Sequence, residues 1–196
     1  MKSISLHPNP IFEREGWESL NGEWDFGFSK KAVKNYRFLS EQAALELCRQ
    51  SVFDHKINVP FCIESELSGI GYTDFLNSVW YKRTVNISPN GNRVFLHIGA
   101  ADYKTTVILN AKIVGSHKGG FTPMCFDITE YAVDGENELF ILCEDNTRDS
   151  LIAGGKQSDR KKSYACLYTR TTGIWQSVYI EYVPFDYVEN FRLTPS

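Results

Sequence analysis

An all-β fold, an antiparallel β-sandwich or jelly roll with one short helix, is predicted by three features of this sequence. Short runs rich in β-branched and aromatic residues recur at fairly regular spacing. Several of these runs alternate apolar and polar residues, and turn residues separate them. The chain of 196 residues, of which 42% are hydrophobic, can also bury a sizeable core. We therefore expect one domain, or one domain with the beginning of another.

The helix is the first of these elements along the chain. Leu39–Arg49 (LSEQAALELCR) is rich in Ala, Leu and Glu, and the Ser40 hydroxyl can cap its N-terminus. We expect a short helix that packs on the edge or the end of the sandwich.

The clearest strand follows at Ser78–Ile87 (SVWYKRTVNI). Val79, Tyr81, Val85 and Ile87 fall on one side of a period-2 pattern in this segment, and mainly polar residues fall on the other. The turn Pro89-Asn90-Gly91 then leads into a second alternating run, Arg93–Gly99, because Asn and Gly accept the positive φ that hairpin turns require.

Further strands are expected over the rest of the chain. They are Tyr103–Leu109, Ile113–Val114, Phe121–Ile128, Glu138–Glu144, Ile174–Val183 and Val188–Leu193. Glu138–Glu144 (ELFILCE) is apolar on both sides, as in a strand that is covered on both faces. Gly173 precedes one of these strands and indicates a bulge or a sharp bend. Gly115–Gly120 (GSHKGG) lacks the residues of a phosphate-binding loop and is interpreted as a plain bend.

Two long loops and the chain's last residues lie outside this regular pattern. The loops, Glu64–Asn77 and Asp145–Ser163, exceed the usual few residues, and such loops are often functional or mobile. The strand at Val188–Leu193 has nothing left to pair with. We therefore expect a sandwich over residues 1–184 and the truncated beginning of a second domain over 185–196.

Composition excludes several classes of function. The formal net charge of −3 offers no broad cationic field for nucleic acid. No segment reaches the roughly 18–20 apolar residues of a membrane helix, so no membrane association is expected. Residues 1–17 contain no apolar run long enough for a secretory signal, which predicts a cytoplasmic protein, with a periplasmic location left open.

The cysteines and histidines indicate neither a metal nor a cofactor. The cysteine count is odd, no two cysteines form a CxxC pair, and the four histidines are scattered. Buried free thiols are the interpretation favoured over disulfides or zinc ligands for Cys48, Cys62, Cys125, Cys143 and Cys166.

Six segments together resemble a known family. They are Leu20–Phe26 (LNGEWDF), Asn58–Gly71 (NVPFCIESELSGIG), Val79–Thr84 (VWYKRT), Asn110–Thr129, Gly135–Leu139 (GENEL) and Tyr168–Glu181 (YTRTTGIWQSVYIE). In this order they resemble the N-terminal sugar-binding jelly roll of family 2 glycoside hydrolases, the β-galactosidase and β-glucuronidase group. The resemblance implies a galactose-binding-domain-like fold, a carbohydrate substrate, and downstream immunoglobulin-like and barrel domains. An oligomer is possible in such a protein.

The resemblance implies no catalytic residue in this chain. Retaining glycosidases use two carboxyl groups about 5–5.5 Å apart, and the family carries both on the barrel. A barrel needs about 250 residues. Asn137-Glu138 resembles the Asn-Glu pair that carries the family's acid/base, but it lies in a turn before an apolar strand. We therefore expect this chain alone not to hydrolyse glycosides.

What the resemblance implies instead is a contribution to the pocket for the terminal sugar. Some members use an acid just before the Arg-x-x-Gly of the closing strand, where this chain has Leu167. Polar residues near the exposed Tyr168 are substitutes, since hydroxyl hydrogen bonds and ring contact suit a sugar. The candidates are Asp145, Asn146, Lys156, Gln157 and Arg170.

Each candidate also has a purely structural interpretation. Arg170 would pair with an acid on the sandwich surface, and the other four would fix the loop or a domain interface. The basic residues Lys156, Arg160, Lys161 and Lys162 would be solvated loop charges rather than an anion site. Two other functions stay open for the whole chain: a free-standing carbohydrate-binding module, and a structural β-sandwich that mediates contacts.

Overall fold

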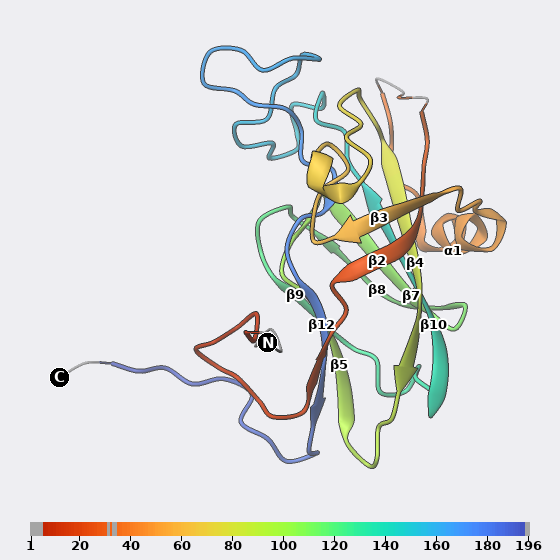
Figure 1. The fold of residues 1–196 in the computed structure, drawn as a ribbon, viewed down its shortest axis with the longest axis vertical. Helices are drawn as coiled ribbons and strands as arrows, with labels where there is room; N and C mark the ends of the chain where they lie inside the picture. The colour runs from red at the N-terminus through yellow and green to blue at the C-terminus, as the bar shows by residue number, and fades with distance from the viewer. Residues whose placement is uncertain (1–5, 31, 33–34, 195–196) are drawn as a thin grey trace.

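Two antiparallel sheets face each other in the computed structural model, which describes residues 6–30, 32 and 35–194 (Figure 1). The four-stranded sheet contains, in spatial order, β1 (Trp17–Ser19), β12 (Val178–Val183), β5 (Arg93–Ile98) and β9 (Met124–Asp127). The six-stranded sheet contains β3 (His55–Val59), β2 (Gly22–Phe28), β4 (Ser78–Ile87), β10 (Gly135–Glu144), β7 (Lys104–Leu109) and β8 (Lys112–Lys118). The predicted all-β sandwich is confirmed.

The core lies between the two sheets and follows the period-2 patterns of the sequence. Val79, Tyr81, Val85 and Ile87 of β4 are all buried, as their alternation predicts. They face the buried side chains of β5 and β12 in the opposite sheet. Trp24 is the largest fully buried side chain, and its indole N–H donates to the Leu20 carbonyl at 2.8 Å.

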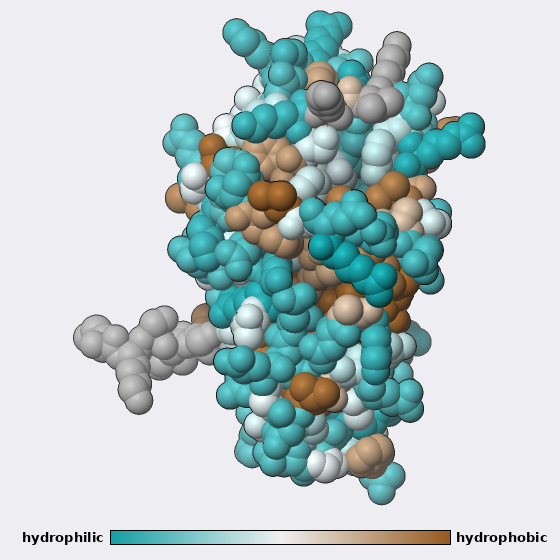
Figure 2. Space-filling view, turned by 90° about the vertical axis from the view of Figure 1, so that its right-hand side faces the viewer, coloured by the Kyte–Doolittle hydropathy of each residue, from teal (hydrophilic) through white to brown (hydrophobic). Residues whose placement is uncertain are grey.

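The one α-helix among the described residues covers the outer side of the six-stranded sheet. In α1 (Glu41–Gln50) the Ser40 hydroxyl accepts a hydrogen bond from the Ala43 N–H at 3.3 Å, which confirms the predicted cap. Ala44 packs with Ile108, Phe140 and Leu142 in a second buried cluster. β10 is therefore covered on both faces, as predicted, while the solvent side of this region is largely hydrophilic (Figure 2).

One predicted strand is wrong. Val188–Leu193 has no regular structure and instead lies over the four-stranded sheet with the N-terminal segment. The Arg14 guanidinium donates to the Val188 carbonyl at 2.9 Å, and the rings of Phe12 and Phe191 lie 5.0 Å apart. A run of suitable residues does not make a strand without a neighbouring backbone to complete its ladder.

Two other segments differ from the prediction in their bounds. Ile174–Val183 forms two strands, because β11 (Gly173–Ile174) pairs with β6 (Ala101–Asp102) in a small ladder of their own, separate from β12. The bend predicted at Gly173 is confirmed by its φ of +81°, and the Tyr81 hydroxyl fills the place of a side chain there. Gly115–Lys118 belong to β8, so the predicted bend is confined to the two glycines that follow.

The two long loops meet at one end of the sandwich, at the top of Figure 1. Segments 6–16 and 184–194 lie together over the face of the four-stranded sheet that is turned away from the core. We call these two places the loop end (residues 64–77 and 145–172) and the outer face. No helix in the described ranges is long and apolar enough to cross a membrane.

Candidate functional site

The loop end is built from two chain segments that are fastened to each other. The Lys161 ammonium pairs with the Asp74 carboxylate at 2.7 Å. The Thr172 backbone N–H donates to the Glu64 carboxylate at 3.0 Å. These contacts join residues far apart in the sequence, so the shape of this end depends on tertiary structure.

Arg170 holds this end together from inside. Its side chain is 3% exposed, and its guanidinium donates to the carbonyls of Thr73, Ser158, Arg160 and Lys161. The guanidinium carbon also lies 4.4 Å from the centre of the Phe75 ring. The prediction that Arg170 pairs with an acid on the surface is therefore wrong, because its donors are used to fix the backbone of both loops.

Gln157 is a second fastening point. Its side-chain amide donates to Asp102 Oδ2 at 2.7 Å and accepts from the Thr171 N–H at 2.7 Å. Both ends of the amide are engaged within the protein. Gln157 thus orients the loop, and a direct contact with a sugar stays a prediction.

Lys156 and Tyr168 lie side by side at the surface. The Tyr168 N–H donates to the Lys156 carbonyl at 3.0 Å, and both side chains are exposed, Tyr168 by 52%. A cation and an aromatic face are thereby presented together to solvent. Of the candidate residues, Lys156 has the position that suits contact with a ligand best.

Asp145 and Asn146 lie beneath the surface. They are 2% and 3% exposed, and the Asp145 N–H donates to the Asn77 carbonyl at 3.0 Å. Burial, with the nearby carboxylates of Asp102 and Glu64, raises the pKa of Asp145 well above its usual value. Asp145 and Asn146 are therefore buried at the loop end, and their direct contact with a sugar stays a prediction.

Two buried acids were missed by the sequence analysis. Burial raises the pKa of Glu64 to about 7 and that of Asp102 to about 6, although hydrogen bonds from Thr172 and Gln157 oppose the shifts. With Asp145 they form a buried acidic group at the loop end. Asp102 and Asp145 each follow an apolar run, but no local signal shows that these acids meet Glu64.

Nothing in the described residues forms a metal centre or a catalytic pair. No group of three or more His, Cys, Asp and Glu side chains in the described part of the chain could hold a metal ion. Asn137 bonds to the backbone of Val133 and Gly135, and Glu138 pairs with Lys82 on β4, so turn and strand chemistry accounts for this Asn-Glu.

The five cysteines are unpaired, as predicted, but not all of them are buried. Cys143 is fully buried, whereas Cys125 and Cys166 are exposed. Burial raises the pKa of Cys143 to about 12, which makes its thiol a weak nucleophile.

Residues 17–184 match the family model described as "Glycosyl hydrolases family 2, sugar binding domain". The chain belongs to this family. The match covers both sheets, from β1 to the end of β12, together with the loop end.

Proteins in this family that resemble the chain are much longer than it is. A β-glucuronidase of Paenibacillus borealis is 43% identical over 140 residues, which are 70% of this chain and 22% of that protein. A β-galactosidase of Thermoanaerobacter pseudethanolicus is 35% identical over 72 residues, 36% of this chain and 10% of that protein. The chain thus spans about a fifth or less of these relatives.

Solved structures show the same fold. A Bifidobacterium dentium β-glucuronidase complexed with coumarin-3-O-glucuronide aligns with a TM-score of 0.62 at 20% identity, over 88% of this chain and 31% of that one. A Ruminococcus gnavus β-glucuronidase in complex with uronic deoxynojirimycin gives a TM-score of 0.63 at 19% identity, over 89% and 30%.

The family's acid position is occupied differently in this sugar-binding domain. Leu167 is partly buried and lies in a tight turn, where its N–H donates to the Tyr164 carbonyl at 2.8 Å. The apolar side chain of Leu167 cannot accept a hydrogen bond from a sugar hydroxyl.

Proposed function

We propose that this chain is the sugar-binding domain of a longer retaining glycoside hydrolase, and that its loop end forms part of the pocket for the terminal sugar. The match of residues 17–184 to the family's sugar-binding domain carries the proposal. In this proposal residues 185–196 lead toward an immunoglobulin-like domain, and the catalytic carboxylates lie on a barrel outside the chain.

A β-glucuronide is the favoured substrate class. The relative with 43% identity is named a β-glucuronidase. The segment 156–162 carries the exposed cations Lys156, Arg160 and Lys162 against one acid, Asp159, while Lys161 is paired with Asp74, so this segment is locally cationic. A surface with excess positive charge attracts a uronate carboxylate more than it attracts a neutral galactoside.

Titration calorimetry of the 196-residue chain with methyl β-D-glucuronide and methyl β-D-galactoside tests this proposal. We expect the glucuronide to bind about threefold to tenfold more tightly at low salt, and the advantage to shrink as salt screens the loop charges. The Lys156→Ala variant should lose that advantage. Lys112→Ala, which removes an exposed cation from β8, is the matched control.

Binding that is equal for the two glycosides at every salt concentration would contradict the proposed preference. The absence of hydrolysis is tested separately with nitrophenyl glucuronide and nitrophenyl galactoside. Turnover by the purified chain above the rate of a heat-denatured sample would contradict the proposal that the catalytic carboxylates lie elsewhere.

A further inference from the structure

A long groove runs over the outer face of the four-stranded sheet. It consists of two adjoining hollows of about 600 Å³ and 670 Å³ that share Asn9, Pro123 and Tyr179. Nothing in the proposed function uses this groove, because the loop end lies beyond the edge of the sheet.

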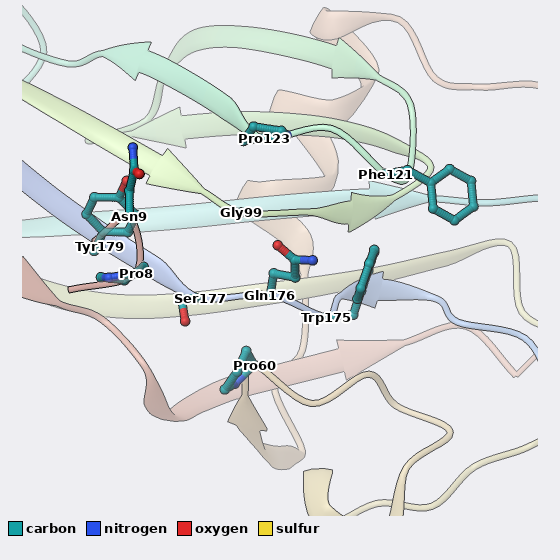
Figure 3. Close-up of a pocket in the computed structure, with 10 residues that line it drawn as sticks. All are labelled: Pro8, Asn9, Pro60, Gly99, Phe121, Pro123, Trp175, Gln176, Ser177 and Tyr179. Atoms are coloured by element: carbon teal, nitrogen blue, oxygen red, sulfur yellow. The ribbon is translucent and has the colours of Figure 1, made fainter. Parts of the chain in front are cut away.

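The groove has a floor and two walls from separate parts of the chain. Gly99, Ser177 and Tyr179 form the floor, Pro8 and Pro60 stand on one side, and Pro123 stands on the other (Figure 3). A Cβ atom at position 99 would lie only 2.8 Å from Gln176 Cβ, so any larger residue at Gly99 would displace Gln176 and change the floor of the groove. Trp175 and Phe121 stand at one end, and the Trp175 indole N–H donates to the Gly120 carbonyl at 2.8 Å.

The groove leads toward the loop end. The Phe121 ring lies 3.3 Å from the place that a side chain at Gly155 would take, so the long loop rests against the end of the groove. Gly155 directly precedes the exposed Lys156. A chain molecule whose terminal unit sits at Lys156 would therefore enter the groove over the Phe121 and Trp175 rings, which contact each other edge to face.

The N-terminal wall is fixed to the floor by a buried carboxylate. Glu181 of β12 is 2% exposed, and it pairs with Arg14 at 2.7 Å, His97 at 3.0 Å and His7 at 3.4 Å. The Tyr179 ring stacks on His97 with their centres 4.6 Å apart. The groove is thus formed in advance, which lowers the entropy lost when a ligand binds.

The lining suits a carbohydrate chain better than another protein surface. Phe121 is 54% exposed and Trp175 is partly exposed, so aromatic surface is available to the faces of sugar rings. The exposed side chains of Asn9 and Gln176 add amide donors and acceptors for hydroxyl groups. Small-molecule sites are usually lined by apolar and aromatic side chains together with a small number of polar groups that orient the ligand.

We propose that this groove binds the sugar units that follow the terminal one, so that the domain recognises a β-linked oligosaccharide and not only its end. This inference rests on the proposed function in taking carbohydrate as the ligand. It adds a second site, on a different face, whose residues come from β12, the segment before β9 and the N-terminal segment.

The test compares ligands of one and four sugar units on the 196-residue chain. Methyl β-D-glucuronide and methyl β-D-galactoside are the short ligands, and a hyaluronan tetrasaccharide and a β-1,4-galactotetraose are the long ones. Titration calorimetry gives the affinities. A change in tryptophan fluorescence that is lost in a Trp175→Phe variant reports occupation of the groove, since Trp17, Trp24 and Trp80 also fluoresce. We expect the tetrasaccharide that matches the preferred terminal sugar to bind at least about tenfold more tightly than its monosaccharide.

Two variants test whether the additional affinity for the tetrasaccharide arises in the groove. Gln176→Ala and Phe121→Ala alter exposed side chains, so the fold should persist, and each should remove most of the additional affinity for the tetrasaccharide. Gln176→Ala, which does not touch the long loop, should also leave monosaccharide affinity unchanged. Phe185→Ala is the matched control, because Phe185 is 68% exposed and lies outside the groove.

The outcomes separate this inference from the proposed function. The proposed groove site is overturned if the monosaccharide and the tetrasaccharide bind equally well. It is also overturned if the additional affinity for the tetrasaccharide persists in both variants, even when the monosaccharide binds. A tetrasaccharide that binds through Gln176 and Phe121 while no monosaccharide binds supports the groove and contradicts the proposed loop-end contact. Binding of neither length overturns both.

Discussion

At the loop end, Glu64, Asp102 and Asp145 are buried together, whereas on the outer face Glu181 is buried among Arg14, His7 and His97. Burial raises the pKa values of the first three acids. Burial also acts on Glu181, but the hydrogen bond and charge of His97 and the charge of Arg14 outweigh it and lower the pKa. Buried carboxyl groups thus keep their protons to higher pH at the loop end and lose them at lower pH on the outer face.

This difference has opposite consequences for stability. A carboxyl group whose pKa is raised in the folded state destabilises the fold as pH rises above its pKa in the unfolded chain. For Glu64 the two pKa values are 4.5 unfolded and about 7 folded, so the destabilisation develops between these pH values. A carboxyl group with a lowered pKa stabilises the fold above its unfolded value, and this contribution is lost as pH falls below 4.5 for Glu181. The loop end should therefore loosen toward neutral pH, and the outer face should loosen in acid.

The largest effect is expected when the loop end loses Arg170. Arg170→Ala leaves four backbone carbonyls without their donor and removes the contact with Phe75, at a cost of about 4 kcal/mol in the free energy of unfolding. Urea denaturation measures the loss, and limited proteolysis should cut the loop 145–163 first. The control Arg160→Ala changes an exposed side chain and should cost less than about 1 kcal/mol. Equal costs for the two variants would mean that Arg170 does not hold the loops.

A smaller effect is expected on the outer face. Glu181→Gln keeps the shape of the side chain but removes the charge that Arg14 and His97 face, at a cost of about 3 kcal/mol at pH 7. The cost should shrink as pH falls below 4.5 toward the lowered pKa of Glu181, where the side chain becomes protonated. Urea denaturation at neutral and at acid pH measures it, and Glu189→Gln, an exposed acid in the same region, serves as the control. A cost that does not depend on pH would contradict the ionised state of Glu181.

The smallest effect has the opposite sign. Glu64→Gln keeps an acceptor for the Thr172 N–H and removes a carboxylate that ionises at a cost, so we expect the variant to be more stable by about 2 kcal/mol at pH 8. The gain should vanish near pH 4, where both forms are neutral. Thermal unfolding followed across this pH range measures it. A gain that persists in acid would place its cause in packing and not in charge.

Much of the fold could be predicted because its signals are local. The alternation of Val79, Tyr81 and Val85, the Ser40 cap and the apolar run of β10 each depend on neighbours in sequence. Val188–Leu193 was predicted as a strand from its composition although no partner for it was found, and the structure shows that composition without a partner is not enough.

The candidate site was harder to predict because its geometry is tertiary. Asp145 follows an apolar strand, and its burial beside Glu64 and Asp102 depends on contacts between distant segments that no local pattern shows. Arg170 itself bonds to carbonyls, which every residue carries, so no particular partner could be read from the sequence. Lys156 and Tyr168 were each predicted to be exposed from the polar loop around them, and both are exposed, but the sequence does not show that the folded loop brings the two together.

Binding of a sugar at the loop end is the central claim, and it is tested most directly by mapping a titration onto individual residues. In two-dimensional NMR of the 15N-labelled chain, millimolar methyl β-D-glucuronide should shift the backbone signals of residues 156–168, with little change in α1. Shifts that are absent from this segment, or that spread evenly over the sandwich, would contradict a sugar contact at the loop end.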